Sequence, residues 1–181
     1  MRLLLDACVL YPTVMREMLI GAARAGFYNP RWSPRILGEW AHAAARLGPE
    51  GAEVAQAEIA ILEAAFPAGS VQNGVQAERG LWLPDADDVH VLAAAVAGSC
   101  DGIVTVNAKD FPRNILGDEG LFRSDPDGLL CRFLDEDPDR LRPVAQAVLD
   151  QANRLAPAPF TIRSLMKKAR LPRLGKRLSD A

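Results

Sequence analysis

Short apolar runs alternate with helical segments through most of the chain, and this alternation restricts the fold more than any other feature of the sequence. The runs expected to form strands are residues 2–5, 27–32, 81–83 and 103–106, with an edge strand near 121–122. The segments with helical spacing, most with proline at or near the start, are residues 12–26, 33–47, 49–66, 85–97 and 127–134. Strands that alternate with helices predict an α/β fold of three layers, with a short central parallel sheet between helices.

The chain is long enough for one domain and an appendage. Its 181 residues are 49% hydrophobic, which is enough to bury a core without disulfides. We expect the α/β domain to occupy residues 1–134. The run at 135–139 contains Pro138 and resembles a linker, and residues 140–155 and 160–170 have helical spacing. Residues 135–181 are therefore predicted to form a helical, basic C-terminal extension.

The charge is divided unevenly along the chain. The net charge is −2, yet residues 161–181 contain seven Lys or Arg and a single acid, Asp180, which leaves 14 basic and 22 acidic residues in the rest. An acidic body with a basic tail indicates that a polyanion binds at the rim of a metal site. A solvated helical tail is an equal alternative. Apolar residues of the tail could instead dock onto the body, a second subunit or a partner helix.

The compartment is predicted from the cysteines and the apolar runs. The three cysteines are far apart, form no C-x-x-C pair and are odd in number, so neither a disulfide framework nor a thiolate zinc site is indicated. The longest apolar run, Val91–Ala97, is far shorter than the roughly 20 residues of a membrane span. We expect a cytoplasmic protein that is neither exported nor inserted into a membrane.

Polar side chains follow the predicted strands at their carboxyl ends, where an open parallel sheet places its ligand crevice. These residues are Asp6 after the first strand, Asp85, Asp87 and Asp88 after the third, and Asn107 and Asp110 after the fourth. Glu39 can join them if its helix packs beside the first strand. Clustered carboxylates repel one another, so a cation is expected among them. Oxygen ligands alone favour Mg²⁺ or Mn²⁺ over zinc.

The same residues resemble a known family. Four segments look like the acidic motifs of PIN domains, in order and at similar spacing: Leu3–Leu10 around Asp6, Ile36–Glu39, Leu83–Ala95 around Asp88, and Ile103–Pro112. The resemblance covers roughly residues 1–134. It is similar to the branch of VapC toxins that have a helical C-terminal extension.

The resemblance implies a PIN fold, a Mg²⁺- or Mn²⁺-dependent endoribonuclease, a homodimer, and neutralisation by a co-expressed antitoxin. By position, Asp6, Glu39 and Asp88 match the three central acids of the metal site. Asp85 and Asp87 would either support the metal ligands from outside the coordination sphere or only cap the helix. Many members have an aspartate near Asn107, so either this amide or the nearby Asp110 fills the fourth position.

A mechanism follows as a hypothesis. An ion held by Asp6 and Asp88 activates water, and Glu39 or Asp110 positions or deprotonates that water. Thr105 either hydrogen-bonds to the site or is simply a good strand residue. The candidate RNA-binding residues are Lys109, Lys167, Lys168, Arg170 and Arg173.

Aromatic and histidine residues are expected to lie outside the site. Trp32, Trp40 and Trp82 are expected in the core, with stacking on RNA bases as the less favoured alternative. His42 is expected at the surface or as a capping group. His90 is excluded because two residues turn an α-helix by roughly 200° from Asp88. Apolar residues of the helix at 49–66 expected to face the core are Val54, Ile59, Ile61, Leu62 and Phe66.

Two other enzyme or signalling classes share the strand-then-aspartate start. A haloacid-dehalogenase-type phosphatase would need a second aspartate where this chain has Cys8. A receiver-type signalling module would need an acceptor aspartate after a middle strand, where residues 50–66 have helical spacing instead. A third alternative keeps the PIN fold, loses catalysis at Asn107 and acts as an antitoxin-bound regulator.

Overall fold

A computed structural model describes residues 1–72 and 75–180 of the chain. The chain forms two compact units, the first of Met1–Tyr11 with Asn29–Ser124, and the second of Pro12–Tyr28 with the chain from Asp125 onward. Each unit is described by itself. The boundary that the sequence predicts between residues 134 and 135 stays a prediction.

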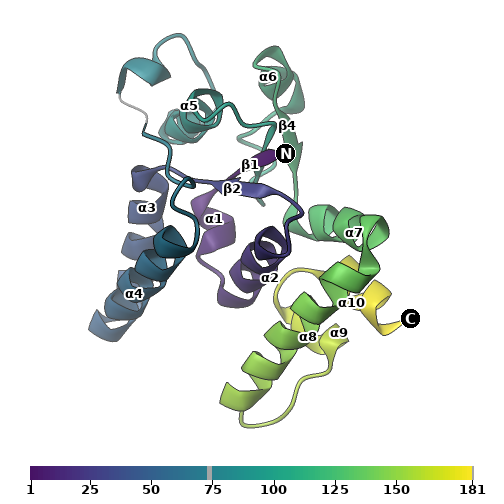
Figure 1. The fold of residues 1–181 in the computed structure, drawn as a ribbon. Coiled ribbons are helices and arrows are strands. Elements are labelled where there is room, and N and C mark those ends of the chain that lie inside the picture. Colours follow the sequence, from purple (N-terminus) through teal and green to yellow (C-terminus); the bar gives the residue numbers. More distant parts are fainter. Residues whose placement is uncertain (73–74, 181) are drawn as a thin grey trace. The chain divides into compact units, whose positions relative to one another are not determined.

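The first unit contains a four-stranded parallel sheet. Its strands are β1 (Arg2–Leu5), β2 (Asn29–Arg31), β3 (Gly102–Val104) and β4 (Phe122–Ser124). Their spatial order is β2-β1-β3-β4, and every neighbouring pair is parallel (Figure 1). The predicted parallel α/β fold is therefore confirmed, with the predicted edge strand in place as β4.

The central strands are buried, as parallel strands between helices require. Leu3, Leu4 and Leu5 of β1 have no exposed surface, and neither do Ile103 and Val104 of β3. A strand that packs apolar side chains from both faces gives the continuous apolar run seen in the sequence rather than an alternating pattern.

Helices pack around this sheet within the first unit. They are α1 (Ala7–Leu10), α3 (Pro34–Ala45), α4 (Pro49–Ala65), α5 (Val89–Ala97) and α6 (Arg113–Asp118), with the 3-10 turns η1 (Val75–Glu78) and η2 (Ala86–Asp88). Helix α5 packs on β1 and β3, and α3 packs on α1 and α4. Figure 1 shows α5 on one side of β1 and β2, with α1 and α3 on the other. The hydroxyl of Ser33 accepts a hydrogen bond from the Ile36 amide at 3.3 Å, which confirms the predicted N-cap.

Two expectations for this unit are wrong. Residues 81–83 form no strand: Leu83 is buried, but Trp82 is 65% exposed, and Pro84 directly after them cannot donate to a strand ladder. The tryptophan prediction is therefore correct for Trp32 and Trp40, which are buried, and wrong for Trp82.

The helix at 49–66 was also expected to bury more than it does. Ile59 and Leu62 are buried together with Ala55, while Val54 and Ile61 are 58% and 61% exposed. The apolar residues are spread around α4, and only the stripe that faces α3 is covered.

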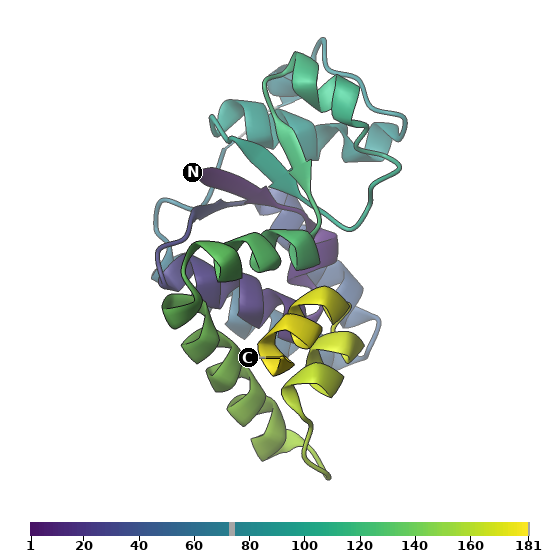
Figure 2. The same cartoon turned by 90° about the vertical axis from the view of Figure 1, so that its right-hand side faces the viewer.

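The second unit is helical. It contains α2 (Thr13–Arg24), α7 (Pro126–Glu136), α8 (Pro138–Leu155), α9 (Ile162–Lys168) and α10 (Pro172–Ser179). Helix α2 packs on α7 and α8, and α10 packs on α7 and α9. Figure 2 shows α9 and α10 as the two yellow helices. Helices after residue 139 were predicted, but the second of the last two, α10, was not.

The predicted linker at 135–139 is wrong. Helix α7 runs through Glu136, and α8 begins at Pro138, so Asp137 alone separates the two helices. A carboxylate oxygen of Asp137 accepts a hydrogen bond from the Arg140 amide at 3.1 Å. Aspartate followed by proline is thus an N-cap and a first helical residue here rather than a flexible connection.

None of the helices in the described part of the chain has the length and apolar character that a membrane span requires.

Candidate metal centre

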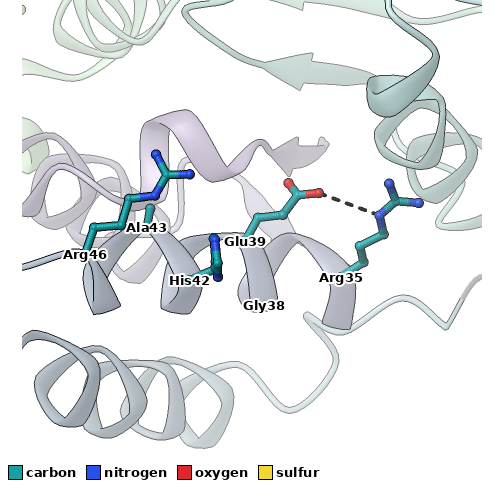
Figure 3. A pocket seen from close by; sticks show the side chains of 6 residues that line it. All are labelled: Arg35, Gly38, Glu39, His42, Ala43 and Arg46. Carbon is teal, nitrogen blue, oxygen red and sulfur yellow. Dashed lines mark ion pairs between the residues drawn. The ribbon is translucent and has the colours of Figure 1, made fainter. Parts of the chain in front are cut away.

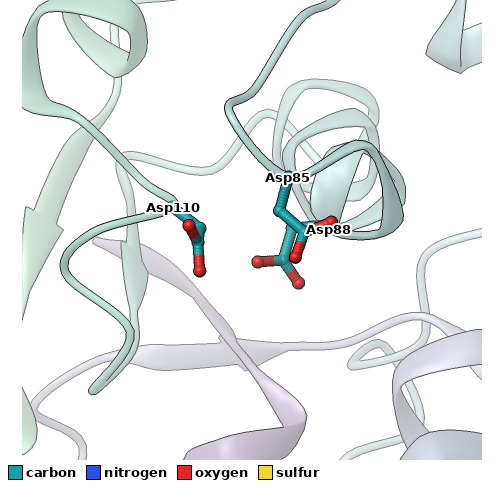
Figure 4. Close-up of side chains that lie close together, drawn as sticks. All are labelled: Asp85, Asp88 and Asp110. Carbon is teal, nitrogen blue, oxygen red and sulfur yellow. The ribbon is translucent and has the colours of Figure 1, made fainter.

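Three carboxylates from two segments of the first unit meet at one point. Carboxylate oxygens of Asp85, Asp88 and Asp110 all lie within 4.8 Å of one another (Figure 4). Asp85 caps the η2 turn before α5 and Asp88 ends that turn, while Asp110 lies in the loop between β3 and α6. Acids from segments that β3 separates in the sequence are therefore close together in space.

Local hydrogen bonds hold these carboxylates in position. The side chain of Asp85 accepts from the Asp87 amide at 2.9 Å, which caps the η2 turn. The loop that carries Asp110 is held by Arg123 of β4, whose guanidinium donates to the carbonyl oxygens of Ala108 and, at 2.7 Å, Phe111. Asp85 is thus both a capping group and a member of the cluster.

Asp6 is fixed at the carboxyl end of β1. Its amide donates to the carbonyl of Val104 at 3.2 Å, and its side chain is 6% exposed. One carboxylate oxygen accepts from the Thr105 hydroxyl at 2.6 Å and from the Cys8 thiol at 3.0 Å. The Thr105 hydroxyl also accepts from the Asn107 amide at 2.9 Å. Sequence reasoning indicated Thr105 as a possible hydrogen-bonding group of the site and missed Cys8 in this role.

The charges of the site act on Asp88. Burial, followed by the charges of Asp6, Asp85 and Asp110, raises the pKa of Asp88 from its ordinary value of 3.8 to about 6, while His90 acts in the opposite direction. Asp6 is therefore close enough to Asp88 to repel it, although it lies outside the group of three. Burial, and then the charge of Asp6, raises the pKa of Cys8 to about 12, which keeps it a neutral thiol donor.

The side chain of Asn107 faces Asp88 with its nitrogen. Its Nδ2 donates to a carboxylate oxygen of Asp88 at 3.1 Å. The structure thus brings both candidates for the fourth position to the site, Asn107 as a donor to Asp88 and Asp110 as an additional charge. Which of them binds a metal stays a prediction.

Glu39 lies outside the three-acid group and has other partners. Its Oε1 is 2.8 Å from Nε2 of His90 and 3.6 Å from Nε of Arg35, and its side chain is 41% exposed. His90 is buried on α5. The rotation argument against His90 does not apply, because Asp88 belongs to the η2 turn rather than to α5. His90 contacts Glu39 of α3, and whether it takes part in the site stays a prediction.

The oxygen donors of the cluster suit a hard divalent cation. Asp85, Asp88 and Asp110 offer only carboxylate oxygens, the ligands that Mg²⁺ and Mn²⁺ prefer. Burial first, and then the charges of the neighbouring acids, raises the pKa of Asp88, and a cation among these acids would offset both effects. These residues therefore fit a divalent metal site.

The other predicted residues lie outside the three-acid group. Asp87 and Lys109 are exposed, and His42 is exposed on α3, as expected. In the second unit, Lys167, Lys168 and Arg170 are exposed, and the Lys168 ammonium lies 5.1 Å from the ring centre of Phe160. Whether these side chains contact RNA stays a prediction.

Arg173 has a structural role in the second unit. Its guanidinium donates to Asp127 at 3.1 Å and to Asp125 at 2.6 Å, and its amide donates to Asp127 at 3.0 Å. Asp127 also accepts from the Leu174 amide at 2.9 Å. These bonds fix the start of α10 to the start of α7, so the positive charge of Arg173 is largely balanced within the unit.

Comparison with known proteins agrees with the geometry. A family model described as PIN domain matches residues 2–109. Searches of the curated proteins and of the solved structures found no match. The matched region contains β1, β3 and the acids Asp6, Asp85 and Asp88, and it covers more than half of the 181 residues. The chain belongs to the PIN domain family, a family of nucleases.

Proposed function

We propose that the chain is a Mg²⁺- or Mn²⁺-dependent endoribonuclease and the toxin of a VapBC-type toxin–antitoxin pair. The observation that carries the proposal is the meeting of Asp85, Asp88 and Asp110 within 4.8 Å, with Asp6 near enough to repel Asp88. Membership of a nuclease family supports the reaction class. The helices after residue 134 support the comparison with VapC toxins that have a helical extension.

The side chains divide the work between holding an ion and placing water. Asp85, Asp88 and Asp110 would hold the ion, and Thr105 and Cys8 fix the carboxylate of Asp6 by donating hydrogen bonds to one of its oxygens. When bound, Mg²⁺ or Mn²⁺ lowers the pKa of coordinated water and offsets charge on the phosphoryl oxygens.

Glu39 is suited to a proton-handling role. Its carboxylate is partly exposed, and the same oxygen, Oε1, contacts both His90 and Arg35. A carboxylate that is fixed but open to solvent can accept a hydrogen bond from water and direct a lone pair of that water toward a phosphorus atom. We assign this positioning step to Glu39.

The phosphatase alternative is disfavoured at one position. Where that class needs a second aspartate as general acid, this chain has Cys8, and its thiol donates to Asp6 with a pKa raised to about 12. A thiol with such a high pKa is a much weaker acid than a carboxylic acid, so it cannot replace the aspartate as the general acid near neutral pH.

Strand scission tests the reaction class. Purified protein is incubated with single-stranded RNA in Mn²⁺, in Mg²⁺ and in EDTA, and the expected result is cleavage only with metal. Asp88→Asn should abolish cleavage, whereas Asp118→Asn, an exposed acid at the end of α6, should not change it. Metal-independent cleavage, or cleavage by Asp88→Asn at the wild-type rate, would contradict the proposal.

Growth of cells tests the toxin role separately. Induced expression of the wild-type chain should stop growth, and expression of Asp88→Asn should not. Co-expression of the protein encoded beside it should restore growth and co-purify with the chain. A nuclease that neither stops growth nor binds its encoded neighbour would keep the reaction and remove the toxin assignment.

A further inference from the structure

A hollow lies along the exposed side of α3. It has a volume of about 450 Å³ and is lined by Arg35, Gly38, Glu39, His42, Ala43 and Arg46 (Figure 3). These positions are three or four residues apart, so they form one stripe on the helix. We call this hollow the α3 groove.

Small residues keep the groove open. A side chain at Gly38 would meet no atom within 4 Å, and Ala43 is the largest apolar residue of the lining. A protein partner usually anchors an interface through aromatic or long aliphatic side chains packed into apolar pockets. The lining of the α3 groove has no aromatic or long aliphatic side chain, and it includes Arg35, His42 and Arg46, so its side chains favour an anionic ligand.

The cations of the groove are placed for a polyanion. Arg35 is bound to Glu39 and lies 3.8 Å from Glu78, whereas among the described residues no acid pairs with Arg46. The exposed His42 lies between them. Eleven residues of α-helix separate the two arginines, which is about 16 Å along the axis. A single phosphate cannot reach both ends, but a chain of phosphates can.

The groove also includes a residue of the proposed reaction. Glu39 lines it, and the same carboxylate is held by His90. Figure 3 shows Glu39 and Arg46 on the same side of α3. A polyanion that lies on His42 and Arg46 is therefore led along the helix to Glu39.

We propose that the α3 groove binds the sugar-phosphate backbone of single-stranded RNA, with Arg46 and His42 contacting phosphates on the approach to Glu39. The identity of the ligand rests on the proposed function, because this RNA is the substrate of that reaction. Backbone contacts carry no sequence information, so the groove adds affinity and register rather than choice of target.

Binding without cleavage tests the groove. Fluorescence anisotropy measures the affinity of the full chain for a labelled oligouridylate in EDTA, over a range of salt concentrations. For a single strand, loss of one phosphate contact lowers the salt slope, which is the slope of log affinity against log salt concentration, by about 0.7. Across a fourfold change in salt concentration, one such contact accounts for about a threefold change in affinity. We expect Arg46→Ala to weaken binding by about that factor at low salt and to flatten the slope, and Arg46→Lys to retain most of both.

A steric variant tests the shape of the groove without a change in charge. Gly38→Leu should fill the hollow and weaken binding of the oligouridylate. Gly117→Leu is the matched control, since a side chain at Gly117 of α6 also meets no atom within 4 Å. Arg24→Ala, at an exposed arginine of α2, is the control for loss of charge. The dinucleotide UpU is too short to span the groove. Arg46→Ala should therefore weaken the binding of UpU far less than the binding of oligouridylate.

The outcomes separate this proposal from the proposed function. If Arg46→Ala and Gly38→Leu bind oligouridylate with wild-type affinity and salt slope, the groove is not an RNA site, whether or not the protein cuts RNA. If they weaken only the capture of the antitoxin, the groove belongs to a protein interface and the proposal is overturned. If they weaken RNA binding while the wild type fails to cut RNA in Mn²⁺, the groove stands and the nuclease assignment fails.

Discussion

Nε2 of His90 lies 2.8 Å from Oε1 of Glu39, and this contact joins α5 to α3 across the first unit. It connects the two acidic regions of the site, because His90 also acts electrostatically on Asp88. Substitution of His90 therefore tests whether Glu39 takes part in the reaction.

His90→Ala should lower kcat by about 10- to 100-fold, the range found when a group that orients a site ligand is removed. The expected cause is a loss of orientation of Glu39, so KM should change much less. His90→Gln can still donate to Glu39 and should recover part of kcat. The measurement is steady-state cleavage of a labelled RNA. Equal activity of His90→Ala and the wild type would show that His90 does not orient Glu39 for the reaction.

Asp88 predicts a pH dependence of stability without metal. Its pKa in the folded protein is about 6 against an ordinary value of 3.8, so between these values the folded state keeps a proton that the unfolded state has lost. In EDTA the free energy of unfolding should therefore fall as pH rises through this window. Asp88→Asn lacks this loss, so its Tm should exceed that of the wild type above pH 6 and match it near pH 4. Thermal melts across the range check this, and parallel Tm curves for the two proteins would contradict it.

Metal should reverse that loss of stability. A ligand that binds only the folded state at 100 times its Kd stabilises the protein by about 2.7 kcal/mol. Mn²⁺ should thus raise the Tm of the wild type above pH 6, and Asp88→Asn should lose most of the effect.

Comparison of Asp110→Asn with Asn107→Ala identifies the fourth group of the metal site. If the charge at Asp110 is the ligand, Asp110→Asn weakens Mn²⁺ binding by calorimetry more than Asn107→Ala does, and the reverse order would assign Asn107.

Two helical glycines should respond in opposite ways to alanine. A side chain at Gly38 has open space, so Gly38→Ala should stabilise the protein by about 0.5–1 kcal/mol. A Cβ at Gly21 of α2 would lie 2.4 Å from Cγ1 of Val144 in α8, so Gly21→Ala should destabilise it by about 1–3 kcal/mol. Chemical denaturation measures both. A destabilised Gly38→Ala would show that the α3 groove is not open.

The start of α10 should depend on Asp127. Its carboxylate accepts from the Arg173 side chain and from the amides of Arg173 and Leu174. Asp127→Ala should destabilise the second unit by about 1.5–3 kcal/mol, the range for hydrogen bonds to a charged group. Asp180→Ala, an exposed acid after the same helix, is the control. Hydrogen exchange of the α10 amides reads the effect directly, and unchanged protection would contradict it.

The strands and the acids at their ends were predictable from the sequence because they depend on local patterns. A buried parallel strand is an apolar run, and an acid directly after it lies at the carboxyl edge of the sheet whatever else the chain does. The sequence thus places Asp6 after β1 and Asp110 after β3, whereas Asp85 and Asp88 reach the cluster from the η2 turn, because the strand expected at residues 81–83 does not form. It also predicts Ser33 as a cap, since that bond spans only three residues.

The rest depends on packing between distant segments. His90 meets Glu39 only because the fold brings a residue of α5 and a residue of α3 together, and no spacing along the chain encodes that contact. Cys8 bonds Asp6 because the chain turns into α1 immediately after β1. Asp137 was misread because aspartate followed by proline fits both a flexible connection and a helix start, and only the neighbouring helices decide between them.

The acidic cluster draws its members from either side of the third strand in chain order, since Asp85 and Asp88 precede β3 and Asp110 follows it. During synthesis, a nascent polypeptide that has not yet released Asp110 from the ribosome cannot assemble this group. If the chain cuts RNA, the nascent chain therefore cannot cleave the RNA of the translating ribosome until most of the first unit has emerged.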